Sequence, residues 1–340
     1  DYWLTPYATF CALKDKFDGA PWQAWPEQYR SYSPRLADDP ELAPGIETAR
    51  KLQFEFQQEW NELRAYANER GVRIVGDMPM YVSAGSADVW SEPDIFDLDG
   101  DGHAAMQAGA PADQLSAEGQ LWGNPTYDWD VLRSDGYDWW LRRLDRAFKL
   151  YDYVRLDRFI GFSSYYEIEA GKPATEGAYA FGPGANLFRA ANKLFGGLPL
   201  IAGNVTPAVR ALIAETGVPG MSIVQFADQD VRNEFTPNRG SVVYTGTHDT
   251  ETLVGWCARS FADGDAEKAV ELARDIERRT AGVENDVVIM PLLFLGNDAR
   301  MNVPGVAEGN WTWQADAADV EAAAAWLREL ADESGRAVEG

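Results

Sequence analysis

The sequence predicts an α/β protein built as a (β/α)8 TIM-type barrel with long inserted loops, and three observations support this. Strand-like segments alternate with helix-like segments along most of the chain. Each expected strand is apolar on both faces, as strands of a parallel sheet covered by helices are. Polar residues recur where these strands end, and in a barrel those ends form one rim that carries the active site.

The first part of the chain combines helices with one strand and a long insertion. Residues 1–17 are helix-like, and residues 47–70 have helical periodicity. The segment 72–82 predicts a buried strand that breaks into a loop at its Gly-Asp-Met-Pro run. Residues 84–131 are rich in Gly, Pro, Asp and Trp, so we expect a loop insertion there, and long loops on a compact scaffold are usually functional.

Helix and strand patterns alternate through the rest of the chain. Expected helices cover 137–150, 185–196, 207–216, 250–280 (with a break at Gly264) and the tail 316–334, and expected strands cover 152–157, 198–203, 221–226, 241–249 and 286–295. With the strand at 72–82 this makes about six strands, so a complete barrel needs about two more upstream of Asp1. We expect residues 1–340 to form a single barrel domain that is incomplete at the N-terminus.

The charge balance excludes several classes of partner. The chain has 54 acidic against 30 basic residues, a net charge of −24, which repels nucleic acid and anionic lipid. No apolar run is long enough for a membrane span, and no secretory signal is evident. The acids are scattered over a normal apolar composition, which favours adaptation to high salt. An ordinary acidic cytosolic protein is the alternative.

Cysteine and histidine are too scarce for most metal sites. Cys11 and Cys257 have no nearby ligand partners and predict buried thiols in a reducing, cytoplasmic compartment. Only His103 and His248 are present, which excludes a multi-histidine site. The run DLDGDG at 97–102 resembles the start of a calcium loop, but its twelfth position is Ala108 rather than Glu, so a polar turn is favoured.

Two charged residues lie in the strand expected at 152–157. Arg155 and Asp157 are two positions apart, so their side chains point to the same side of the pleat. Arg155 can keep the Asp157 carboxylate ionised and oriented. Attack on an anomeric carbon needs such a carboxylate. The alternative is a buried ion pair that only ties the barrel together.

Other strand ends carry further polar residues. His248 and Asp249 end the strand at 241–249, and both point into a cleft if this strand belongs to the same barrel. A His beside an Asp suits hydrogen bonding to sugar hydroxyls, although Asp249 or Thr250 could instead be the N-cap of the next helix. The remaining strand-end residues are Asp77, Gly203, Asn204 and Asp228.

The run GQLWGNPTYDW at 119–129 places aromatic residues beside an amide. Trp122, Tyr127 and Trp129 could stack on the apolar faces of a sugar ring, with Asn124 bonding its edge. The alternative is a loop whose aromatic side chains form a local packed core.

Several longer motifs occur together and in one order. They are ATFCALKDKFDGAPWQAWPEQYR, RAYANERGVRIVGDMPMYV, SADVW, GQLWGNPTYDW, VRLDRFIGF, GVPGMSIVQFA, VVYTGTHD, ARMNVPG and GNWTW. Taken together they resemble the 4-α-glucanotransferases, the amylomaltase or disproportionating-enzyme family of the α-amylase-like clan. The resemblance runs over nearly the whole chain.

This resemblance implies a retaining enzyme that transfers α-1,4-glucan segments between maltodextrins. Asp157 would be the nucleophile that forms a covalent glucosyl-enzyme. Asp249 would bind ring hydroxyls and stabilise the oxocarbenium-like transition state. Arg155 would orient the nucleophile, and His248 would hydrogen-bond the sugar at the reacting centre.

The resemblance also assigns residues around these four. Asp77 would belong to the rim beside them, Trp122 and Asn124 would lie in the loop over the cleft, and Asp228 is a weaker candidate. The partners would be a maltodextrin donor and acceptor, with neither nucleotide nor metal as cofactor. We expect a monomer or a weak homo-oligomer.

The chain departs from the family pattern at an important place. The family's general acid/base is a Glu in a strand-end A-E-D-L-G run ahead of T-P, whereas residues 198–207 read LPLIAGNVTP. Retention needs a second carboxyl about 5–5.5 Å from the nucleophile, and Asn204 cannot donate a proton. The alternative function is therefore a catalytically impaired relative that binds maltodextrins. Arg158 also replaces the usual His.

A third possibility is a hydrolase of the α-amylase type. Such an enzyme would release reducing ends with water and would not lengthen chains. The order of the motifs is that of the transferase, which favours transfer to a second glucan.

Overall fold

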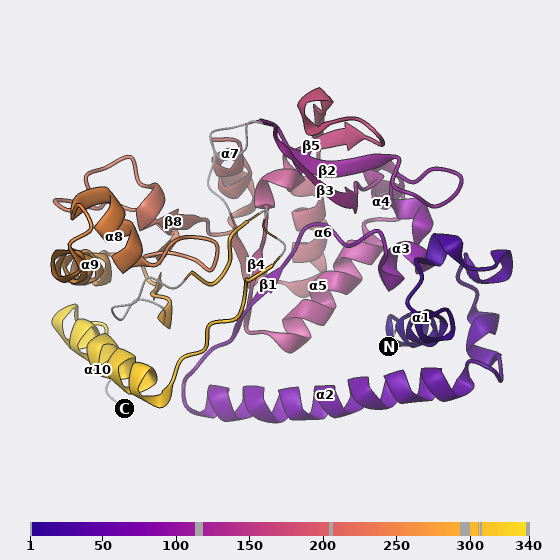
Figure 1. Ribbon diagram of the computed structural model, residues 1–340, viewed down its shortest axis with the longest axis horizontal. Helices are drawn as coiled ribbons and strands as arrows, with labels where there is room; N and C mark the ends of the chain where they lie inside the picture. The colour runs from indigo at the N-terminus through magenta and orange to yellow at the C-terminus, as the bar shows by residue number, and fades with distance from the viewer. Residues whose placement is uncertain are drawn as a thin grey trace. The chain divides into compact units, whose positions relative to one another are not determined.

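The computed structural model describes residues 2–112, 118–203, 207–292, 300–304, 306 and 308–337 (Figure 1). It divides into two compact units, Asp1–Val218 (unit 1) and Pro219–Gly340 (unit 2), and each is described by itself. The expectation of one barrel domain over 1–340 stays a prediction.

Unit 1 contains a parallel sheet of three described strands. They are β1 (Val75–Met78), β4 (Tyr153–Leu156) and β7 (Leu200–Ala202), in the order β1-β4-β7. The helices that precede and follow them are α2 (Ala43–Glu69), α5 (Asp138–Leu150), α6 (Ala185–Phe195) and α7 (Pro207–Thr216). This confirms the alternation of helices and strands predicted for this part of the chain. Parallel strands need such long crossover connections, and a helix usually supplies them.

The segment expected to be a loop insertion contains regular structure. It forms α3 (Ala87–Ser91), β2 (Met106–Ala110), β3 (Gln120–Pro125) and α4 (Trp129–Ser134). Together with β5 (Ser164–Glu169) and β6 (Ala178–Phe181), the two strands make an antiparallel sheet in the order β3-β2-β5-β6. The sequence did not predict β2 because Met-Gln-Ala-Gly-Ala lacks β-branched residues and its partner β5 lies far along the chain. Residues 97–102 form a turn, as predicted.

An aromatic core holds unit 1 together. Its largest fully buried side chains include Trp25, Trp90, Trp140, Tyr127, Phe159, Phe162 and Phe188. The helix α1 (Leu4–Lys16) packs against the first half of α2, where Gly45 lies against Ala12 (Figure 1). Cys11 on α1 is half-buried rather than fully buried, and it is a free thiol. No helix among the described residues is long and apolar enough to span a membrane.

Asp152 attaches the end of α2 to the start of the parallel sheet. Its carboxylate accepts hydrogen bonds from Arg64 and Asn68 on α2 and from the backbone N–H of Ile74. Burial alone would raise the pKa of Asp152, but the Ile74, Asn68 and Arg64 bonds outweigh it and lower the pKa to about 2. The position of β1 beside β4 therefore depends partly on this carboxylate.

Unit 2 contains a second parallel sheet with helices. Its described strands are β8 (Met221–Ile223), β9 (Val242–Tyr244) and β10 (Val288–Ile289), in the order β10-β9-β8. Its helices are α8 (Leu253–Phe261), α9 (Ala266–Ala281) and α10 (Ala317–Glu333). The predicted break at Gly264 separates α8 from α9, and Gly264 has a φ of +83°. Burial raises the pKa of the free Cys257 thiol on α8 to about 12.

Glu277 joins α9 to α10, which lie side by side in Figure 1. The indole Nε1 of Trp326 donates to its carboxylate at 2.6 Å. Burial raises the pKa of Glu277 to about 7, although the Trp326 bond and the Arg274 and Arg278 charges act in the opposite direction. The carboxyl is therefore protonated well above its ordinary pKa of 4.5.

We predict that Glu277 makes unit 2 less stable as the pH rises. The folded pKa lies above the unfolded one, so the free energy of unfolding should fall between about pH 4.5 and pH 7, by up to about 3 kcal/mol. Glu277→Gln cannot ionise, so the variant should lose this part of the pH dependence. Denaturant unfolding of both proteins at about pH 5 and pH 8 checks this. Equal pH dependence in the two proteins would contradict the prediction.

Candidate active site

The strand ends of unit 1 bring two carboxylates to one guanidinium. Asp77 on β1 is the register partner of Arg155 on β4, and Asp157 follows β4 directly. Arg155 Nη1 donates to both carboxylate oxygens of Asp77 at 2.7 Å, and its Nη2 donates to Asp157 Oδ1 at 3.0 Å. The predicted contact of Arg155 with Asp157 is confirmed, and Asp77 joins it.

The burial of the three groups differs in a way that suits a binding surface. The Arg155 side chain is 13% exposed, whereas Asp77 and Asp157 are 39% and 34% exposed. Burial opposes the charge of Arg155, but the two carboxylates together raise its pKa above the ordinary value. An ion pair that only tied the sheet together would not need its carboxylates at the surface. The cation is thus less exposed than the two anions, which stay accessible.

Gly203 leaves room for the Arg155 guanidinium. A Cβ at this position would lie 2.7 Å from the carbonyl oxygen of Leu156 and 3.1 Å from the guanidinium carbon of Arg155. The Gly203 N–H donates to Leu156 O, and its carbonyl accepts from Phe159 N–H. Gly203 therefore fixes the backbone on both sides of Asp157. Its neighbour Asn204 lies outside the described residues.

Arg158 and Trp122 form a second contact next to Asp157. Arg158 has a φ of +49°, an uncommon backbone state for a residue other than glycine. Its guanidinium lies 3.7 Å from the centroid of the Trp122 ring, which brings β3 to the residue after Asp157. Asn124 on the same strand donates to the carbonyl of Val82 at 2.8 Å. Trp122 and Asn124 are both half-buried.

The aromatic run at 119–129 divides between strand and core. Residues 120–125 are strand β3 rather than loop. Tyr127 and Trp129 are buried and pack against Trp140, so for these two side chains the packed-core interpretation is confirmed. Trp122 alone of the three aromatic side chains is only half-buried, and it contacts Arg158, the residue after Asp157.

His248 and Asp249 occupy the turn after β9 in unit 2. Neither Asp249 nor Thr250 caps the following helix, because the N-cap of α8 is Thr252, whose side chain accepts from Gly255 N–H. The capping alternative is therefore wrong. Thr250 instead closes the turn by accepting from the N–H of Thr247 at 3.0 Å.

The described residues of the segment 300–311 (300–304, 306 and 308–311) include two that contact the His248–Asp249 pair. Asn302 Nδ2 donates to Asp249 Oδ1 at 2.6 Å, and His248 Nε2 lies 3.5 Å from Asp249 Oδ2. The Trp311 ring centroid lies 5.2 Å from that of His248. Trp311 is 61% exposed and has a φ of +60°, an outlier for so bulky a residue.

Sequence reasoning assigned no role to Asn302 or Trp311. Asn302 lies in ARMNVPG and Trp311 lies in GNWTW, two of the motifs that carried the family resemblance. An amide and an indole side chain in these motifs were the signal from which a role could have been predicted. Asp228 lies beyond the 3-10 turn Val224–Phe226 rather than at the end of β8, and it is exposed. Within the described part of the chain, Asp228 forms no hydrogen bond or ion pair with the His248–Asp249 pair.

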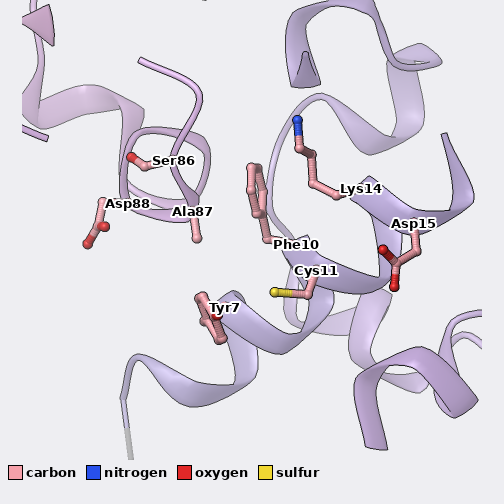
Figure 2. Close-up of a pocket in the computed structure, with 8 residues that line it drawn as sticks. All are labelled: Tyr7, Phe10, Cys11, Lys14, Asp15, Ser86, Ala87 and Asp88. Atoms are coloured by element: carbon pink, nitrogen blue, oxygen red, sulfur yellow. The ribbon is translucent and has the colours of Figure 1, made fainter. Parts of the chain in front are cut away.

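A separate cavity lies between α1 and α3, with a volume of about 350 Å³ (Figure 2). Its lining residues are Tyr7, Phe10, Cys11, Lys14, Asp15, Ser86, Ala87 and Asp88. None of Asp77, Arg155 and Asp157 lines this cavity. In the described ranges, no group of three or more His, Cys, Asp and Glu side chains is arranged to hold a metal ion.

Comparison with known proteins finds relatives both by sequence and by structure. A family model described as 4-alpha-glucanotransferase matches residues 1–318. The 4-alpha-glucanotransferase of Streptococcus pneumoniae is 40% identical over 335 residues, and that of Synechocystis is 40% identical over 343 residues. Each match covers 92% of this chain and 66% of the relative, so the chain spans just under two thirds of their length.

Two solved structures share the fold. An amylomaltase from Streptococcus agalactiae in complex with acarbose has a TM-score of 0.89 and 34% identity, over 99% of this chain and 73% of that one. An amylomaltase from Corynebacterium glutamicum has a TM-score of 0.74 and 17% identity, over 98% and 54% of the two chains. The predicted (β/α)8 type of fold agrees with these neighbours, whereas the predicted inserted loops and N-terminal incompleteness stay predictions.

We predict that Gly203→Ala destabilises unit 1. The nearest atom to the new Cβ is a backbone oxygen, so β4 or β7 must shift, at a cost of about 1–3 kcal/mol. Gly197→Ala is the matched control, since its Cβ would meet nothing within 4 Å. The free energies of unfolding of both variants check this. Equal effects of the two substitutions would contradict the close packing of Arg155 on Gly203.

Proposed function

We propose that this chain, which belongs to the 4-alpha-glucanotransferase family, transfers α-1,4-glucan segments between maltodextrins with retention. The observation that carries the proposal is the Arg155-bound, half-exposed carboxylate of Asp157 at the end of β4. A fixed and ionised carboxylate of this kind suits attack on an anomeric carbon. The complex of the Streptococcus agalactiae amylomaltase with acarbose supports a glucan-like ligand.

In this mechanism Asp157 is the nucleophile. Its free oxygen attacks C1 of a donor glucose, the bond from C1 to the leaving 4-oxygen breaks, that oxygen takes a proton from water, and a covalent glycosyl ester forms. The 4-hydroxyl of a second glucan then attacks C1, gives its proton to water and releases the carboxylate of Asp157. Arg155 keeps the carboxylate directed, because it binds the other oxygen.

Asp249 and His248 bind a glucose ring of the glucan in the proposed function. Asp249 accepts hydrogen bonds from ring hydroxyls, and these strengthen as positive charge develops at the ring. His248 adds a further hydrogen bond. Trp122 and Asn124 contact the glucan next to Asp157, with Asp77 at the rim and Asp228 as the weakest candidate. The exposed ring of Trp311 beside His248 offers another apolar face for a sugar.

A second candidate function follows from the run LPLIAGNVTP. It contains no acidic residue after β7, and general acid–base help is typically worth about 10²–10⁴-fold in rate. Two other acids are poor substitutes because of their positions: Glu215 is paired with Arg189, and Glu167 lies on the antiparallel sheet rather than at an end of the β1-β4-β7 sheet. These observations favour a maltodextrin-binding relative with impaired turnover.

Incubation with maltotriose tests the proposed function. We expect slow formation of glucose together with maltodextrins longer than the substrate. Asp157→Asn should reduce this redistribution by at least about 10³-fold and leave maltodextrin affinity within about threefold, since it removes the nucleophile at nearly constant volume. Asp130→Asn on the surface of α4 is the control.

Three outcomes can be told apart in that assay. Measurable maltodextrin affinity without redistribution would favour the binding relative. Reducing ends without longer products would favour a hydrolase. Absence of both affinity and turnover would contradict both proposals.

We also propose that the scattered acids adapt the chain to high salt. With a net charge of −24, self-repulsion destabilises the folded state, and salt screens it over about 3 Å at 1 M against about 30 Å at 0.01 M. The melting temperature should therefore rise between low and molar KCl. A melting temperature that does not rise would count against the adaptation.

A further inference from the structure

The contacts of Asn302 reach both members of the His248–Asp249 pair. Its side-chain Nδ2 donates to Asp249 Oδ1 at 2.6 Å, and its backbone N–H donates to the carbonyl of His248 at 3.1 Å. One residue thus fixes the side chain of Asp249 and the main chain immediately before it. From this geometry we propose that Asn302 is the positioning residue of Asp249, an assignment that rests on the proposed glucan-binding function.

Arg300 also connects Asp249 with Asn302. Its Nη2 donates to the carbonyl of Asp249 at 2.6 Å, and its Nε donates to the carbonyl of Asn302 at 2.9 Å. The main chains of the two segments are therefore joined at two points. Asn302 cannot move away from Asp249 without breaking these bonds as well.

The two carboxylate oxygens of Asp249 have different neighbours, and this difference shows what the Asn302 amide contributes. Asn302 binds Oδ1, whereas His248 Nε2 is 3.5 Å from Oδ2, beyond a good hydrogen bond. Oδ2 is therefore the oxygen left for a sugar hydroxyl. An amide NH2 group can only donate, so its bond to Oδ1 fixes the rotation of the Asp249 carboxylate.

Asn310 in the same segment provides a matched control. Its Oδ1 accepts from the N–H of Val303 at 2.9 Å, and its Nδ2 donates to the carbonyl of Val306 at 2.7 Å. Both bonds stay within the segment. If Asn302 served only to keep the segment folded, changing Asn310 would have the same effect.

The test compares Asn302→Asp with Asn310→Asp in the full chain. Maltotriose affinity is measured by calorimetry from about pH 4 to pH 8 in high salt. In Asn302→Asp a second carboxylate lies against Asp249, and two carboxylates sharing a site retain a proton to higher pH. The pH at which half of the affinity is lost on acidification should move up by at least about one unit relative to wild type. Asn310→Asp should leave it in place.

A second variant covers the case in which Asn302→Asp does not fold. Asn302→Ala removes the donor without adding charge and should weaken affinity at pH 7 by about tenfold, while Asn302→Ser, which keeps a donor, recovers part of it. Circular dichroism and thermal melting verify folding. Normal affinity and an unshifted pH profile in the Asn302 variants, or equal effects at Asn310, would overturn the assignment and leave the proposed function standing. Absence of maltotriose affinity in the wild type would instead contradict the proposed function itself.

Discussion

The Arg155 guanidinium is the interaction on which the candidate site of unit 1 depends. It binds Asp77 and Asp157 at once, and two carboxylates so close to one another would repel without it. The parallel pairing of β1 with β4 places Asp77 opposite Arg155, and the absence of a side chain at Gly203 leaves space for the cation. Arg155 can therefore bind both carboxylates because of three features: the pairing of β1 with β4, the register of that pairing, and the glycine at position 203.

The two candidate acids are held by chemically different partners. Asp157 is bound by a full positive charge, whereas Asp249 is bound by the neutral amide of Asn302. Charge-assisted bonds are the stronger kind, so Arg155 holds the Asp157 carboxylate firmly in one direction. A neutral donor leaves more of the negative charge available to sugar hydroxyls and to a developing oxocarbenium ion. The difference suits the two roles proposed for these residues.

Local sequence patterns predicted the contacts and helix boundaries that depend on residues close together along the chain. The contact of Arg155 with Asp157 follows from their spacing within one strand, and the helices around Gly264 follow from periodicity and a breaker. The contact of Asp249 with Asn302 joins residues 53 positions apart, and the β2–β5 pairing also joins distant segments, so no local pattern reveals them. The N-cap of α8 is Thr252, which lies only two positions after Thr250. Several polar residues in that turn are of a type that can cap a helix, so the local sequence did not identify the correct one.

The most direct test is to trap the covalent intermediate with α-maltotriosyl fluoride. Fluoride leaves from C1 with its electron pair and without protonation, so an ester bond from C1 to Asp157 can form without a general acid. Rapid acid quenching and peptide mass mapping should find one maltotriosyl group on the peptide that contains Asp157, and none in Asp157→Asn. An unlabelled wild-type protein, or a label on a different residue, would contradict the central role of Asp157.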